Sequence, residues 1–238
     1  MTTAMLSAKN SYRIGYSQLA MIEPPRATNS WRPVKHVDLV NELIDALQVR
    51  GMQPTRAEYA VSKDNLKLFG TFIFEDYLGG EYTTALGFRA SNDKRMSIQA
   101  VAGAHVFVCD NMMLSGQHIT FKRKHTSGLN LRQVVRDGIE RYLKDSDLTT
   151  QRIERIRAIS LSDDEAKSAL YDLLQTKILP SKLLPTVHEA YFDKLEEYPD
   201  CAPRSLWGLH NACTRGAKLL EPARQFEFTR SLGEVFHL

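Results

Sequence analysis

Apolar and polar positions follow two different periods along this chain. Between positions 37 and 50, Val40, Leu43, Ile44 and Leu47 recur at helical spacing, and Gly51 follows them. This pattern predicts an amphipathic helix that ends at the glycine.

The next fifty residues favour β-strands. The segments 58–62, 67–74, 82–90 and 96–108 are rich in β-branched and aromatic residues, and turn sequences separate them at 63–65, 79–80 and 91–93. Tight turns join antiparallel strands, because parallel strands need long crossover connections. We therefore expect an antiparallel meander of four or five strands.

Helical spacing returns after position 130. It predicts helices over 130–145, 153–159, 163–175, 186–198, 205–216 and 223–232. Ser162 and Glu165 stand at the spacing of a capping box before the third of these helices. The prolines at positions 24, 25 and 33 prevent continuous helix at the start of the chain, so residues 1–35 are predicted to be irregular.

The predicted fold is α+β. It consists of an antiparallel β-meander packed with helices against one face, followed by a helical C-terminal half. The expected organisation is an irregular segment over 1–35, an α+β core over 36–160 and a helical part over 161–238, all within one continuous domain.

Composition narrows the class of protein. The chain has 238 residues, 43% of them hydrophobic, with no apolar run of membrane-spanning length and no signal-peptide pattern. Its three cysteines stand at unrelated spacings. We expect reduced thiols in a cytoplasmic protein that does not enter a membrane.

The net charge of +3 is unevenly distributed. Residues 117–157 carry ten basic and five acidic groups, whereas residues 158–202 carry four basic and nine acidic groups. Such blocks indicate either a cationic binding surface or two segments that neutralise each other in the fold.

A cationic cluster follows the apolar run near position 108. We expect a loop here that presents Lys122, Arg123, Lys124 and His125 to phosphate groups, because lysine and arginine supply most nucleic-acid affinity by counterion release. The candidate binding residues also include a possible base-stacking ring and two arginines on the following helix, namely Phe121, Arg132 and Arg136.

Other chemistry is weaker in the sequence. Cys109, His118 and His125 are metal-ligating residue types, but their spacing matches no zinc motif. Asp110 ends the apolar run, where a turn role is expected. The acidic string at 163–165 fits a helix start, since the helix dipole favours carboxylates there. We therefore expect no metal and no cofactor.

Several short motifs are similar to those of the phage/plasmid-like proteins, a large domain-of-unknown-function family. They are Trp31 to His36, Leu86 to Asp93, Val108 to Met112, Lys124 to Thr126 and Leu206 to Thr214. The resemblance implies a phage or mobile-element protein that works in replication, recombination or counter-defence. The order of helix, meander and long helix is also similar to the core of Rad52-type single-strand annealing proteins.

The leading hypothesis is a non-enzymatic protein that binds single-stranded DNA, as an oligomer, to protect or anneal it. Two alternatives remain open. One is a counter-defence protein that binds a host defence protein. The other is a metal-dependent enzyme acting on nucleic acid, for which Asp110, His118 and His125 would be needed.

Overall fold

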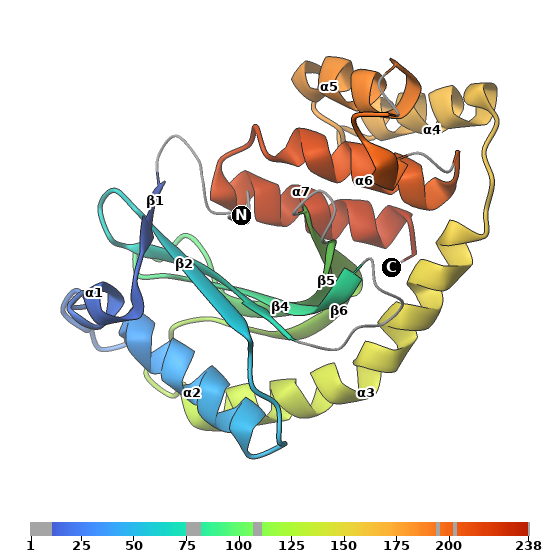
Figure 1. The fold of residues 1–238 in the computed structure, drawn as a ribbon. Coiled ribbons are helices and arrows are strands. Elements are labelled where there is room, and N and C mark those ends of the chain that lie inside the picture. The colour runs from blue at the N-terminus through green and yellow to red at the C-terminus, as the bar shows by residue number, and fades with distance from the viewer. Residues whose placement is uncertain (1–10, 75–81, 107–110, 194–195, 202–203, 238) are drawn as a thin grey trace.

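The computed structural model describes residues 11–74, 82–106, 111–193, 196–201 and 204–237. Its centre is one antiparallel sheet in which each strand pairs with the next in the chain (Figure 1). The strands are β1 (Ser11–Ile14), β2 (Arg56–Ser62), β3 (Lys67–Ile73), β4 (Tyr82–Ser91), β5 (Ile98–Val106) and β6 (Asn111–Arg123). The predicted meander is confirmed, with six strands instead of four or five.

The additional strands lie in two segments for which the sequence predicts irregular structure. β1 lies inside the segment 1–35 and pairs with β2, and α1 (Tyr16–Ala20) follows β1 in the chain. β6 includes Phe121, Lys122 and Arg123, which pair with the start of β5. The cationic cluster therefore begins on a strand and is not wholly a loop.

Two helices cover one face of the sheet. They are α2 (His36–Gln48) and α3 (Leu131–Arg157), and α2 confirms the helix predicted before Gly51. Phe72, Phe88 and Phe121 of the sheet pack with the buried faces of both helices in one core cluster. Burial of this apolar area is the main force that holds the helices on the sheet.

Close approach of α3 to β6 depends on a glycine. A side-chain Cβ at Gly138 would lie 2.4 Å from Cδ1 of Phe121, well inside van der Waals contact. The backbone of α3 therefore lies directly on the Phe121 ring, which is 2% exposed. Glycine lowers helix propensity by roughly 1 kcal/mol, so its place in mid-helix here has a packing reason.

The C-terminal half is helical, as predicted. It contains α4 (Asp163–Gln175), α5 (Leu184–His188), α6 (Leu206–Ala217), α7 (Pro222–Val235), 3₁₀ turns at Ser181–Leu183 and Pro199–Cys201, and a π-helical turn at Glu189–Asp193. The capping box of α4 is confirmed, since Ser162 Oγ accepts from Glu165 N at 3.3 Å and Glu165 Oε2 accepts from Ser162 N at 2.8 Å.

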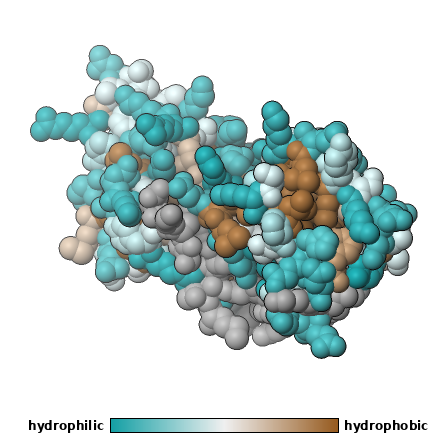
Figure 2. Space-filling model, turned by 90° about the horizontal axis from the view of Figure 1, so that it is seen from above, coloured by the Kyte–Doolittle hydropathy of each residue, from teal (hydrophilic) through white to brown (hydrophobic). Residues whose placement is uncertain are grey.

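The expectation that helices cover one face only is wrong. α7 lies on the face of the sheet opposite α2 and α3, with α6, α4 and α5 stacked beyond it (Figure 1). These helices have their own core cluster, to which the end of α3 contributes Ile153 and Ile156. Seen from above, this layer is mainly hydrophilic with a few apolar patches (Figure 2). The single long α3 joins the two cores, where the sequence predicts two helices.

A buried histidine lies inside the C-terminal core. The His210 ring on α6 stacks on Trp207 with centroids 5.7 Å apart, meets the edge of Phe236, and is 0% exposed. Burial lowers the pKa of His210 to about 3, because a charged imidazolium is poorly solvated there. The side chain is therefore neutral in the folded protein over the physiological range.

No helix within the described ranges is both long enough and apolar enough to cross a bilayer.

We expect Gly138→Val to lower the free energy of unfolding by about 2 kcal/mol or more, because the new side chain overlaps the Phe121 ring. The measurement is urea unfolding followed by circular dichroism. Phe121→Leu in the Gly138→Val background should recover part of the loss, since it removes the ring atoms that clash. If the double variant instead lost as much free energy of unfolding as the two single variants together, this packing of α3 on the Phe121 ring would be contradicted.

We expect His210→Phe to weaken the pH dependence of stability. The unfolded histidine takes up a proton near pH 6.5 but the folded one only near pH 3. The unfolded state thus binds more protons below pH 6.5, and stability falls as pH falls through this window, by about 2 kcal/mol from pH 7 to pH 5. Urea unfolding at pH 7 and pH 5 should show that the free energy of unfolding falls by about 2 kcal/mol less in the variant than in the unaltered protein. An unchanged difference would contradict the assignment.

Candidate functional site

A cleft opens between the sheet and the C-terminal helices. Its sheet wall comes from β4, the β4–β5 turn and β6, and its other wall from α7 and the segment after α4. Its volume is about 650 Å³, which is within the range of pockets that hold a small organic ligand. The cleft thus lies on the face of the sheet for which the sequence analysis predicts no helix.

The cleft is strongly cationic. Three cations come from the sheet side and three from the helical side, and among the lining residues only Glu227 is acidic; the cations are Arg89, Arg95, Lys122, Lys177, Lys182 and Arg224. All except Arg89 are exposed. Within the described parts of the chain, no carboxylate lies in ion-pair distance of Lys122, Lys177, Lys182 or Arg224.

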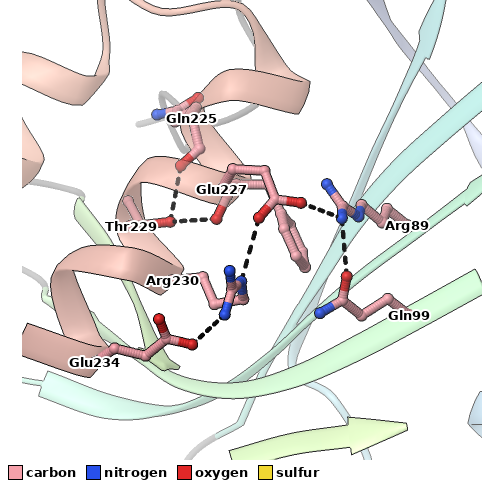
Figure 3. A network of polar contacts seen from close by, with 8 residues as sticks. Arg89, Gln99, Gln225, Glu227, Thr229, Arg230 and Glu234 are labelled. Atoms are coloured by element: carbon pink, nitrogen blue, oxygen red, sulfur yellow. Dashed lines mark hydrogen bonds and ion pairs between the residues drawn. The ribbon is translucent and has the colours of Figure 1, made fainter. Parts of the chain in front are cut away.

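Arg89 lies at the back of this cleft. Strand alternation directs it toward α7, while its neighbours Phe88 and Ala90 enter the core under α2 and α3. Its guanidinium donates to Gln99 Oε1 at 2.9 Å and to the Glu227 carboxylate (Figure 3). The guanidinium also lies over the Phe226 ring, with its carbon 4.5 Å from the ring centroid. The residue is 5% exposed.

The Glu227 carboxylate is held on both sides by arginines. Arg89 reaches it from the sheet, and Arg230 donates to it at 3.2 Å from the next turn of α7 (Figure 3). Partial burial opposes ionisation, but these hydrogen bonds and charges outweigh it and lower the pKa of Glu227. The carboxylate is therefore ionised at neutral pH and offsets one of the six positive charges.

The strand-end cations Lys122, Arg123 and Lys124 are exposed, as the sequence predicts. Lys122 points into the cleft, and strand alternation places Arg123 on the other side of the sheet. Within the described residues none of the three has a carboxylate partner. The alternative in which the acidic segment 158–202 neutralises the cluster does not match these contacts.

The acidic segment has other partners. Asp163 pairs with Arg204, Asp164 with Lys167 and Asp200 with Arg215. These contacts lie within the C-terminal half. The Asp163–Arg204 and Asp200–Arg215 pairs join separate elements of that layer, and the Asp164–Lys167 pair lies within α4.

Two of the predicted binding residues are buried. Phe121 is 2% exposed beneath α3, so its ring is not available to stack on a base, and that expectation is corrected. His125 is 4% exposed, and burial lowers its pKa, so it is neutral and is not a phosphate contact. Phe121 was expected to be exposed because the sequence analysis places a loop where the structure has the end of β6.

The two arginines predicted on the following helix lie apart from the cleft. Arg132 and Arg136 are exposed on α3, the helix that covers the opposite face of the sheet. The Arg132 Nε is 3.9 Å from a Glu42 carboxylate oxygen on α2. They form a separate basic surface, and the structure does not bring them together with Lys122.

The metal and thiol candidates are only partly visible. Cys109 and Asp110 lie outside the described residues, and the side chain of His118 is also outside them. Where side chains are described, no three His, Cys, Asp or Glu groups come close enough together to hold a metal ion. Cys201 and Cys213 are buried thiols whose pKa values are raised by desolvation, which suits packing and not nucleophilic chemistry.

Three of the short motifs quoted from the sequence meet at one end of the sheet, namely Trp31 to His36, Leu86 to Asp93 and Lys124 to Thr126. The Asn92 side chain accepts from Val34 N at 3.1 Å and donates to Val34 O at 2.8 Å. Arg32 N donates to His125 O at 3.2 Å, and His36 Nε2 lies 2.9 Å from Asn65 O. These polar contacts hold the segment before α2 against the turns of the sheet, so these three motifs have a structural role here.

The sequence reasoning missed most of the cleft, namely Arg89, Arg95, Lys177, Lys182, Arg224 and Glu227. One signal was present in the sequence. Arg89 interrupts the apolar run of β4, and a charged residue at an inward-facing strand position requires a partner or a function.

Comparison with known proteins identifies a family but no function. No curated protein and no solved structure matches the chain. The family model described as Domain of unknown function (DUF932) matches residues 27–231, which is most of the chain, and the protein therefore belongs to this family.

Proposed function

We propose that this protein binds nucleic acid, as a non-enzymatic protein that holds a single strand of DNA on its cationic surface. The observation that carries the proposal is the exposed cluster of Lys122, Arg123 and Lys124, which has no carboxylate partner among the described residues. Unpaired lysines and arginines displace the counterions of a polyanion, and this release is favourable.

The charge around the cluster supports a polyanion over a neutral partner. Lys122 belongs to both the strand-end cluster and the cleft, so it connects the cluster to the cations of both cleft walls, while Arg123 lies on the other side of the sheet. A local concentration of one sign of charge attracts an oppositely charged ligand over a distance of about 10 Å at moderate salt. A protein partner of mixed charge would gain less from this surface.

A single strand fits the geometry better than a duplex. The cleft volume of about 650 Å³ is within the range of pockets that hold one small organic group, so the cleft suits a single nucleotide and not a base-paired duplex. Because Phe121 is buried, the proposed contact depends on phosphates and not on base stacking, so little preference for base sequence is expected.

The setting that we propose is a phage or mobile element acting in the cytoplasm of a bacterial host. The protein would protect or anneal the strand there, as an oligomer. This part rests on the similarity of the short sequence motifs to phage/plasmid-like proteins.

The test is fluorescence anisotropy with a labelled 20-nucleotide dT strand over a series of salt concentrations. We expect the Lys122→Ala/Arg123→Ala/Lys124→Ala triple variant to bind about tenfold more weakly or worse at 100 mM salt. The slope of log affinity against log salt should become less steep by about 2, since each lost contact to a single strand contributes about 0.7.

A matched control removes the same charge elsewhere. The Arg141→Ala/Lys144→Ala/Arg155→Ala triple variant alters three exposed cations of α3, and its affinity should stay within about twofold of the unaltered protein. Equal losses in both triple variants would show a general charge effect and reject the assigned surface. Absence of binding at 50 mM salt would reject the function and favour a protein partner.

A further inference from the structure

Arg89 is the most deeply buried of the cations that line the cleft. Its Nη2 atom is saturated by Gln99 and Glu227, but its Nε, also buried, has no hydrogen-bond partner among the described residues. An unpaired donor of a buried charged group costs on the order of 1–3 kcal/mol. Such a donor at the wall of a cleft points to an anionic ligand.

The opposite wall supplies the cations that a phosphate group needs. Lys177, Lys182 and Arg224 line the cleft from the helical half, and none has an ion-pair partner in the described parts of the chain. Arg95 and Lys122 face them from the sheet. A phosphate between the walls would therefore meet donors from two sides, as phosphate sites require.

We infer that this cleft is a phosphate-binding subsite for one nucleotide of the bound strand, with Arg89 at its base and Glu227 as an acidic group that competes with the phosphate. The inference rests on the proposed function, because it takes the ligand to be a nucleic-acid strand. The inference extends the proposed binding surface to the cations of the helical wall, which lie more than fifty residues beyond the basic cluster in sequence.

Glu227, the one carboxylate among the lining residues, separates a binding role of the cleft from a structural one, because each role predicts a different change in affinity when its charge is removed. Glu227 is half exposed at the cleft, with its side chain 47% accessible, and it holds Arg89. A phosphate entering the cleft is repelled by this charge and must share Arg89 with it. Replacing the Glu227 carboxylate with an uncharged group of the same shape should therefore strengthen the binding of phosphate in the cleft.

The first variant is Glu227→Gln. Its affinity for the labelled 20-nucleotide dT strand should rise about three- to tenfold at 100 mM salt, since a repulsive charge is lost and the amide oxygen still accepts from Arg89. If the carboxylate served only to hold α7 on the sheet, affinity would stay the same or fall. Either of those results overturns the inference.

The second variant is Lys177→Gly, chosen because it should keep the fold. Lys177 has a φ of 59°, a left-handed conformation in which glycine is favoured over other residues. Thermal unfolding should shift little, while affinity for the strand falls about threefold and the salt slope lessens by about 0.7. Lys167→Ala, an exposed lysine of α4 outside the cleft, is the control and should leave both unchanged.

The outcomes separate the two proposals. If the strand binds and needs Lys122, Arg123 and Lys124, but Glu227→Gln and Lys177→Gly bind as the unaltered protein does, the cleft subsite alone is rejected. If no strand binds, both proposals fall. Thymidine monophosphate that binds as tightly as the strand would show a free nucleotide to be the ligand, and would overturn the assignment to a strand.

Discussion

The contact between Arg89 and α7 is the interaction on which the arrangement of the two halves depends. Arg89 lies on the sheet face opposite α2 and α3, where the apolar cluster is small and includes Phe226 of α7. Its guanidinium joins the sheet to α7 through Glu227 and through the Phe226 ring (Figure 3). A buried arginine is costly without partners, so this pairing fixes α7 in position and with it the second wall of the cleft.

This arrangement also explains why the two faces of the sheet differ. The face under α2 and α3 is packed with aromatic rings, and Gly138 lets the backbone of α3 lie directly on the Phe121 ring. The face under α7 is held through a polar network with a smaller apolar cluster. The large apolar core closes the interface between the sheet and α2 and α3. The interface between the sheet and α7 has a smaller core and a local polar contact, and the cationic cleft lies beside that contact.

Charge is distributed between the halves for different purposes. The acidic segment supplies Asp163, Asp164 and Asp200 to ion pairs inside the helical layer. The cations at the end of β6 and on both walls of the cleft receive no such compensation in the described chain, apart from the Arg89–Glu227 pair and the long Arg95–Asp93 contact. The net charge of +3 therefore understates the local positive potential.

The sequence by itself determined most of the helices, the antiparallel meander and the exposure of Lys122, Arg123 and Lys124, because local periodicity, turn chemistry and capping act between near neighbours. It did not reveal that the cluster begins on β6, that Phe121 and His125 are buried, or that Lys177 and Arg224 line the same cleft as Lys122. Those features depend on α3 covering one face of the sheet and α7 the other. Contacts between distant segments are decided by which surfaces pack together, and no local pattern records that choice.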